Sequence, residues 1–245
     1  MSAAERLPAL RQKRLAVFLV NLIYFAALLA VGVLAFLRSA ACAWVLALLC
    51  AAIYLLVVRP IVSRYKASLR EAILALTVGR ELTHYSYAPK SGVSGDRLES
   101  TGLVPAPLQA MHSREHIQGR AGMMDVELAD VTFPIRENNR NAMFSGCYLG
   151  VTCPGAAFPA CRVEAGRTET AALPKKQREL LERLGGTIPG SLYLRMEGER
   201  LDILLRGRFL GFPINPLMPV TEKTLSADPL PELAEAIRLA QLCRS

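Results

Sequence analysis

The sequence predicts an α+β fold, in which an N-terminal two-helix transmembrane hairpin precedes a cytoplasmic domain with a largely antiparallel sheet and flanking helices. Two uncharged apolar stretches stand near the N-terminus, one directly after the other. Apolar and polar residues then alternate in short paired segments between residues 118 and 206, and helical spacing of apolar residues flanks this region on both sides. Hairpin strands bracketed by helices are typical of the α+β class.

The composition is that of a protein partly embedded in lipid. Of the 245 residues, 52% are hydrophobic and only 20% are charged, and the mean hydropathy of +0.27 is too apolar for an ordinary soluble domain. The same figures exclude a disordered chain, a collagen-like repeat and a small disulfide-stapled protein, because the chain holds only 17 glycines, 15 prolines and 6 cysteines.

Residues 1–58 are predicted to form a short tail and the transmembrane hairpin. The stretch 15–37 holds 23 residues without a charge, and at about 1.5 Å per residue such a helix crosses a hydrocarbon core of about 30 Å. It also exceeds the roughly 7–15 apolar residues that are usual in a cleaved signal peptide. The stretch 40–58 is shorter and richer in alanine, so alone it is the more marginal span. Only Arg38 and Ser39 connect the two, which predicts a tight antiparallel pair.

Basic residues are concentrated at the N-terminal end of the chain. The formal net charge is +8, and residues 1–66 hold eight basic side chains against one acidic side chain. Of these basic residues, only Arg38 lies between the two spans. The positive-inside rule therefore predicts a multi-pass protein of the cell inner membrane with both termini in the cytoplasm. The basic flanks should also hold anionic lipid of the bilayer, at about 1 kcal/mol per residue. Lys and Arg are nowhere interleaved with stacking aromatic residues, so no nucleic acid is expected as a partner.

Residues 59–83 are predicted to form an amphipathic juxtamembrane helix. It is expected to restart at Arg59 and Pro60, because proline is tolerated in a first helical turn. Apolar residues recur at three- and four-residue spacing to about Val78, and Gly79 is the expected end. The apolar face is expected to cover the sheet; the alternative, a dimerising coiled coil, needs three or four heptads where only about two exist.

Residues 84–245 are predicted to form the cytoplasmic domain. The segment 84–107 is rich in Ser, Gly and Pro and is predicted to be a loop with one short helix. Residues 118–135 predict a hairpin or a bulged strand pair, in which the alternation shifts near Asp130. The remaining predicted elements are strands at 143–153 and 160–164, a helix at 174–184, a hairpin at 191–206 and a last helix that begins at Asp228 and Pro229.

Several short motifs of the cytoplasmic part are similar to those of one bacterial family. They are Tyr85-Ser86-Tyr87-Ala88-Pro89, Gly92-Val93-Ser94, Leu98-Glu99-Ser100-Thr101-Gly102-Leu103, Ile117-Gln118-Gly119 and Phe144-Ser145-Gly146. Together with the two-span anchor and the amphipathic helix, they resemble the domain-of-unknown-function 3137 family over about residues 59–206. The resemblance implies a membrane-associated α+β module. It implies no reaction and no catalytic residue, because the family has no assigned chemistry.

One segment has a spacing typical of a catalytic metal site. Residues 112–116 match the H-x-x-E-H pattern of inverted zincins. On a helix, this spacing would put His112 and His116 on one face as metal ligands and leave Glu115 to activate water. Nearby prolines and a glycine leave room for barely two helical turns, so the alternative is a surface or capping role for both histidines. A third ligand would have to come from the later predicted helix, which offers Glu179 and Glu182.

The cysteines and glycines show no further pattern typical of a metal or phosphate site. Neither a C-x-x-C pair nor a Gly-rich phosphate-loop motif occurs, and no cofactor is expected. Cys147 and Cys153 share parity on one predicted strand, so these two and Cys161 are interpreted as core thiols, reduced in the cytoplasm. Cys42 and Cys50 are interpreted as small apolar fillers of the second span.

Residues 209–219 are unusually apolar for a segment whose prolines forbid regular structure. Such a segment either packs over the sheet as a loop or docks a partner or the bilayer. The side chains that would make a docking contact are Phe209, Phe212, Ile214, Leu217 and Met218.

Two functions of different classes fit these observations. The first is a membrane-anchored, non-enzymatic module that binds or scaffolds a protein partner near the inner leaflet, through segment 209–219 and the sheet face. The second is a membrane-tethered metal-dependent hydrolase that uses His112, Glu115 and His116.

Overall fold

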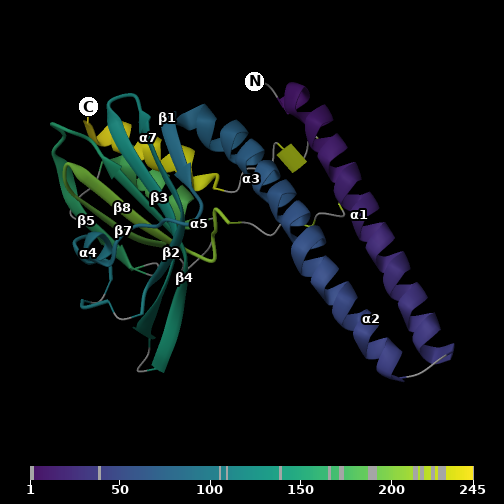
Figure 1. Ribbon diagram of the computed structural model, residues 1–245. Coiled ribbons are helices and arrows are strands. Elements are labelled where there is room, and N and C mark those ends of the chain that lie inside the picture. Colours follow the sequence, from purple (N-terminus) through teal and green to yellow (C-terminus); the bar gives the residue numbers. More distant parts are fainter. Residues whose placement is uncertain are drawn as a thin grey trace. The chain divides into compact units, whose positions relative to one another are not determined.

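The computed structural model has the α+β fold that the sequence predicts (Figure 1). It describes residues 3–37, 40–104, 106–108, 110–137, 140–164, 167–170, 174–186, 192–211, 215, 218–221, 224–225 and 230–244. The chain divides into two compact units. The helical unit consists of Met1–Thr77 and Pro213–Ala227, and the sheet unit consists of Val78–Phe212 and Asp228–Ser245.

The helical unit contains the predicted antiparallel helix pair. Its elements are α1 (Ala3–Leu37), α2 (Ala40–Ile53), one π-helical turn η1 (Tyr54–Val58) and most of α3 (Arg59–Glu81). Two side-chain contacts align α1 with the chain that follows it. The ring centroids of Tyr24 and Tyr54 lie 5.3 Å apart, and Lys13 Nζ donates to Ser68 Oγ at 3.2 Å. Tyr24 and Tyr54 therefore lie at the same height along the helix pair, and so do Lys13 and Ser68, although each two are distant in sequence.

Both predicted spans are helical over the described residues. Residues 15–37 lie within α1, and residues 40–58 form α2 and η1. Both helices are long and apolar enough to cross a membrane. The predicted connection through Arg38 and Ser39 lies outside the described residues.

The structure differs from the prediction at Pro60, where the helix does not restart. The backbone N–H of Arg59 donates to the carbonyl of Tyr54, five residues back, which widens the turn before the proline. Proline lacks an N–H and its ring crowds the preceding turn, and a widened turn is a known way to absorb this. The second span therefore continues into α3 without a break in the helix.

The helix also passes the predicted stop at Gly79 and ends at Glu81. A Cβ on Gly79 would lie 3.3 Å from Cε1 of Tyr85, so the glycine lets this ring approach the helix instead of ending it. Strand β1 (Thr83–Ala88) follows at once, where the sequence predicts a loop. Every β1 side chain is exposed or half-buried, so this edge strand lacks the apolar alternation that would have revealed it.

The sheet unit is built on one eight-stranded sheet in the described part of the chain, with the order β1-β2-β3-β4-β8-β7-β5-β6. All neighbouring strands are antiparallel, as predicted. Pairing of β4 with β8 joins two hairpin regions that are distant in sequence. The strands after β1 are β2 (His112–Ala121), β3 (Met124–Glu137), β4 (Arg140–Thr152), β5 (Phe158–Glu164), β6 (Arg167–Thr170), β7 (Leu192–Gly198) and β8 (Arg200–Arg206).

The shift of alternation predicted near Asp130 is a β-bulge on the neighbouring strand. β3 pairs with β4 in one unbroken register, so β3 itself has no extra residue. The register of β2 with β3 shifts between Arg114 and Ile117, and Glu115 has a φ of 58° there. Asp130 and its apolar neighbours on β3 are all buried because both faces of this strand are covered, which hides the alternation.

Two layers cover the sheet. On the first face, the α4 face, the short helix α4 (Gly95–Glu99) and the residues after it pack on a core cluster. On the opposite face, the α7 face, α7 (Glu232–Arg244) contacts β4 and β5, and α5 (Lys175–Gly186) packs on α7. The predicted start of the last helix at Asp228 and Pro229 lies outside the described residues. The core cluster consists of Val93, Leu98, Leu103, Val104, Ala129, Val131, Phe133, Phe144, Tyr148 and Leu204.

Candidate functional site

The α4 face of the sheet is apolar at one end and polar at the other. Ala129, Tyr148 and Leu204 form a cross-strand row within the core cluster. Side chains that lie opposite one another on neighbouring strands project from the same face, so the next two rows are also on the α4 face. The first contains Gln118, Glu127, Gly150 and Asp202, and the second contains Arg120, Asp125, Thr152 and Arg200.

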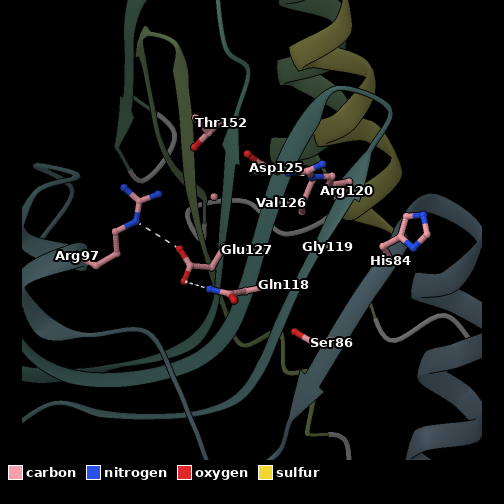
Figure 2. Close-up of a pocket in the computed structure, with 11 residues that line it drawn as sticks. His84, Ser86, Arg97, Gln118, Gly119, Arg120, Asp125, Val126, Glu127 and Thr152 are labelled. Atoms are coloured by element: carbon pink, nitrogen blue, oxygen red, sulfur yellow. Dashed lines mark hydrogen bonds and ion pairs between the residues drawn. The ribbon is translucent and has the colours of Figure 1, made fainter.

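A cleft of about 580 Å³ lies over these polar rows (Figure 2). Besides residues of both rows, its lining includes His84 and Ser86 of β1 and Arg97 of α4. Figure 2 shows Arg97 and Gln118 reaching toward Glu127 from two sides. Positively and negatively charged side chains line the cleft. It therefore offers a ligand hydrogen bonds and ionic contacts more than apolar contacts.

Glu127 lies at the centre of the cleft. Its carboxylate accepts from Arg97 Nε at 3.3 Å and from Gln118 Nε2 at 3.4 Å, and it lies 2.9 Å from His116 Nε2. The side chain is only 19% exposed. Charged hydrogen bonds of this kind are stronger than neutral ones, so three partners from α4 and β2 fix the carboxylate in one orientation. This arrangement suits recognition better than attack on a substrate.

Helix α4 holds Arg97 in place. Ser94 caps the helix, because its hydroxyl accepts from the backbone N–H of Arg97 at 3.2 Å. Leu98, the next residue, is fully buried in the core cluster and fixes the helix to the sheet. The guanidinium therefore reaches Glu127 from a supported element, which lowers the entropy cost of the pair.

A buried tyrosine and a buried aspartate form a hydrogen-bonded pair beside the cleft. The hydroxyl of Tyr148 donates to Asp202 Oδ1 at 2.7 Å, and Arg200 Nη2 lies 3.2 Å from the same oxygen. Gly150 makes room for this contact, because a Cβ there would lie 2.4 Å from the tyrosine hydroxyl. Burial raises the pKa of Asp202, although the hydroxyl of Tyr148 and the guanidinium of Arg97 oppose the shift. Burial also raises the pKa of Tyr148.

The described residues contain no catalytic arrangement of a familiar kind. In this part of the chain, no histidine hydrogen-bonds a hydroxyl or a thiol, as a nucleophile with its base would require. No group of three or more His, Cys, Asp or Glu side chains gathers there to hold a metal ion.

The H-x-x-E-H segment is a strand in the structure, so the helical geometry that the motif needs is absent. His112 is exposed at the start of β2, whereas His116 contacts Glu127. Glu115 lies at the bulge, is buried, and accepts a hydrogen bond from the Tyr87 hydroxyl. Of the two candidate third ligands, Glu179 is exposed and pairs with Lys175, and the side chain of Glu182 lies outside the description.

A second buried carboxylate fixes the start of segment 209–219. Asp130 accepts from the backbone N–H groups of Leu210 at 2.7 Å and Gly211 at 2.8 Å. A Cβ on Gly211 would lie 2.9 Å from Asp130 Oδ2 and 3.3 Å from Cγ of Glu115, so the backbone approaches both acids closely. Burial raises the pKa of Asp130, and the neighbouring Glu115 carboxylate raises it further.

Only two of the five predicted docking residues, Phe209 and Met218, lie within the described residues. Phe209 is half-buried and Met218 is exposed. Phe212, Ile214 and Leu217 lie outside the described residues.

The later part of the apolar segment belongs to the helical unit. Pro213–Ala227 groups with α1 and α3, where Val220 and Leu225 are buried. The carbonyl of Val220 accepts from Arg11 Nε at 3.5 Å. The described residues just after segment 209–219 therefore pack within the helical unit, and a docking role of the segment itself stays a prediction.

Cysteine burial agrees with the sequence interpretation. Cys147, Cys153 and Cys161 are buried in the sheet unit, and Cys50 is buried in the second span. All of them are free thiols. The side chain of Cys42 lies outside the description.

Sequence reasoning missed the cleft residues Arg97 and Glu127 and the buried Asp202 beside the cleft. Polar residues that alternate with apolar ones on a strand normally face solvent, so their pattern did not distinguish a site. A usable signal was the position of Asp202 between Leu201 and Ile203 in an otherwise apolar strand, since a charge there is unusual unless it has partners.

No protein-family model, curated protein or solved structure matches this chain. The resemblance to the domain-of-unknown-function 3137 family therefore stays a prediction, and function has to be argued from the structure.

Proposed function

We propose that this protein is a membrane-anchored binding module of the cell inner membrane. The helices α1 and α2 anchor it in the bilayer, and the sheet unit, on the cytoplasmic side, binds a protein partner through the polar cleft. The role is recognition or scaffolding, with no reaction of its own.

The distribution of exposed apolar side chains carries the anchoring part of the proposal. Among the described residues, all the exposed large hydrophobic side chains lie between Leu15 and Val57 except Met123, Met143, Met218 and Leu242. Burial of one such side chain is worth about 1.5–3 kcal/mol, and water-soluble proteins rarely expose apolar patches of more than a few hundred Å². Contact with lipid would stabilise this part of the chain, whereas contact with water would cost free energy along both helices.

The flanking residues support the orientation. Basic side chains lie in the first part of α1, before its apolar stretch, and after η1, whereas Arg38 is the one basic residue between the spans; this asymmetry favours cytoplasmic termini. Trp44 lies near the start of α2, at the end of the second span away from the basic residues, and is 73% exposed. An aromatic ring at such a position is typical of the membrane–water interface.

The cleft supports a binding role. Its central carboxylate is already held by three side chains, and both charges are represented around it. A polar peptide segment of a partner could add hydrogen bonds along the exposed Arg120, Asp125 and Ser86 without displacing a core contact.

Membrane fractionation with matched variants tests the anchor. The wild-type protein should remain in the membrane pellet after alkaline carbonate extraction. Leu29 and Leu48 lie near the centres of the first and second span and are 73% and 70% exposed. Replacing both by Asp should move a large fraction out of the pellet, since each Asp near a span centre costs about 2.5–3.5 kcal/mol. The control Met123→Asp/Met143→Asp should stay in the pellet. Intact wild-type protein in the soluble fraction would contradict the anchor.

Site-specific photo-crosslinking tests the cleft. A photoreactive residue at Ser86 should give a discrete adduct that the same residue at Lys176, on the exposed side of α5, does not give. Arg120→Glu should remove the adduct, because Arg120 is 68% exposed and its reversal changes the cleft charge without disturbing the core. Equal crosslinking at both positions would contradict the binding role of the cleft.

A further inference from the structure

We infer that seven basic residues at the cytoplasmic end of the helix pair form a binding surface for the headgroups of anionic phospholipids. The inference rests on the membrane anchoring proposed above and adds a lipid class to it. We call these residues the basic collar. They are Arg11, Lys13 and Arg14 of α1 and Arg59, Arg64, Lys66 and Arg70 of α3.

Contacts between the helices bring Lys66 and Arg70 of α3 level with the α1 half of the collar. Lys13 donates to Ser68, and the helices run antiparallel with equal rise per residue. Counting outward from this pair places Arg11 level with Arg70 and Arg14 level with Ala67, next to Lys66. The other two basic residues of α3, Arg64 and Arg59, lie further along the helix toward the apolar spans. The collar is therefore one band drawn from two helices, although its members are some fifty residues apart in sequence.

The collar directly adjoins the apolar surface. Leu15 follows Arg14 and is 58% exposed, and Val57, two residues before Arg59, is 49% exposed. The same count places Asn21, the one amide of the first span, close to the level of Arg59. Charges at this boundary lie where phospholipid phosphates lie, and long basic side chains can extend along the helix to reach them.

The charge of the helical unit is almost entirely positive. No Asp or Glu occurs between Leu7 and Arg70. The whole unit holds ten basic residues against Glu5, Glu71 and Glu222, whereas the sheet unit is nearly neutral with 19 basic and 18 acidic residues. Five collar residues have exposed side chains: Arg11, Lys13, Arg59, Arg64 and Lys66.

The chemistry of the collar favours a phosphodiester with a net negative charge. Guanidinium groups bind phosphate through paired hydrogen bonds, and ammonium groups add point charges. A zwitterionic headgroup would bring its own ammonium group into this positive band, so an anionic lipid is the better match.

Lipid retention by the full-length protein tests the inference. The wild-type protein and its variants are reconstituted into nanodiscs of phosphatidylcholine with phosphatidylglycerol, re-extracted in mild detergent, and examined by native mass spectrometry for bound lipid. The wild type should retain phosphatidylglycerol over phosphatidylcholine. Lys13→Gln/Lys66→Gln should lower that retention about tenfold or more, because two charges near the surface are lost. The control Lys175→Gln/Lys176→Gln, which removes two exposed charges of α5, should retain lipid like the wild type.

Three results would overturn the inference: equal retention of both lipids by the wild type, equal losses in the collar and control variants, or displacement of phosphatidylglycerol by millimolar inorganic phosphate, which would identify free phosphate as the ligand. Failure of the anchor is distinguishable from these outcomes. In that case the wild type would not enter nanodiscs or the membrane pellet at all, whereas failure of the lipid inference leaves it in the membrane without a lipid preference.

Discussion

Gly150 and Tyr148 together determine the buried contact of Tyr148 with Asp202 beside the cleft. The tyrosine ring is fully buried and its hydroxyl reaches Asp202 over the backbone of Gly150. A glycine in a strand interior normally weakens the strand, and it is commonly found where another group approaches the backbone closely. Here that group is the side chain of Tyr148, two residues earlier on the same strand. The effect of a substitution at Gly150 therefore depends on the tyrosine.

Gly150→Ala should destabilise the protein by about 1–3 kcal/mol, because the new Cβ would lie 2.4 Å from the tyrosine hydroxyl in a packed site. Urea unfolding of the full-length protein in detergent measures the change. Gly95→Ala is the control, since its Cβ meets nothing within 4 Å, and it should change stability by less than about 1 kcal/mol. Adding Tyr148→Phe should recover part of the loss, and strictly additive effects would contradict the proposed clash.

Asp202 should make stability depend on pH. Burial raises its pKa in the folded state above the value of an exposed carboxyl, so the folded protein holds this proton more tightly than the unfolded chain. Its contribution is then present at acidic pH and is lost as the pH rises through the raised pKa. Asp202→Asn keeps an oxygen for Tyr148 and Arg200 but does not titrate.

Unfolding free energies of the wild type and Asp202→Asn, measured at intervals from pH 4 to pH 8, check this sign. The wild type should lose stability relative to the variant as the pH rises. A difference that is constant across this range, or that grows in favour of the wild type, would show that burial does not dominate the titration of Asp202.

At the scale of one element, β2 shows where sequence reasoning fails. Its first half carries the H-x-x-E-H spacing, which has meaning only on a helix, and its bulge at Glu115 turns consecutive side chains away from regular alternation. His116 is directed to Glu127, whereas Glu115 is buried with Tyr87. Spacing alone could not reveal this, because the bulge depends on pairing with β3 and on the covering segment around Gly211.

Elements with their own local signals were predicted well. The hairpin of β7 and β8 and the helix α5 have complete periodic patterns, and the two N-terminal stretches are continuous apolar runs. The structure confirms the hairpin and confirms the other three segments as helices. Edge strand β1 and the continuous helix through Pro60 were missed, since both depend on neighbours that the local pattern does not contain. The cleft was missed for the same reason: β4 and β8 meet only after the sheet has formed.

The two histidines of β2 should behave differently when replaced. His112→Ala should change stability by less than about 0.5 kcal/mol, because the side chain is exposed. His116→Ala should cost about 1 kcal/mol through loss of the Glu127 contact. Neither change should alter zinc content, which we expect to be well below one ion per chain by mass spectrometry of the purified full-length protein. Stoichiometric zinc that both variants lose would revive the hydrolase hypothesis.

At the scale of the whole molecule, charge and apolar surface are segregated between the two units. The helical unit holds nearly all the net positive charge and nearly all the exposed large apolar side chains, whereas the sheet unit is close to neutral and buries its own core. Such segregation is what a bilayer requires of a tethered domain, because the tether has to match hydrocarbon and headgroups while the domain stays in water. It also predicts which sites face which side of the membrane.

Cysteine labelling in intact cells tests the topology. Ser39→Cys, between the spans, should react with a membrane-impermeant maleimide added outside, once the outer envelope is made permeable. Ser245→Cys, at the C-terminus, should react only after the inner membrane is opened, because the positive-inside rule keeps both basic flanks in the cytoplasm. The wild type is the control. Its Cys50, Cys147, Cys153 and Cys161 are buried and Cys243 lies on the expected inner side, and its outside labelling measures any reaction of Cys42, three residues from Ser39. Outside labelling of Ser245→Cys with protection of Ser39→Cys would invert the topology, and the binding cleft would then have to meet its partner outside the cytoplasm.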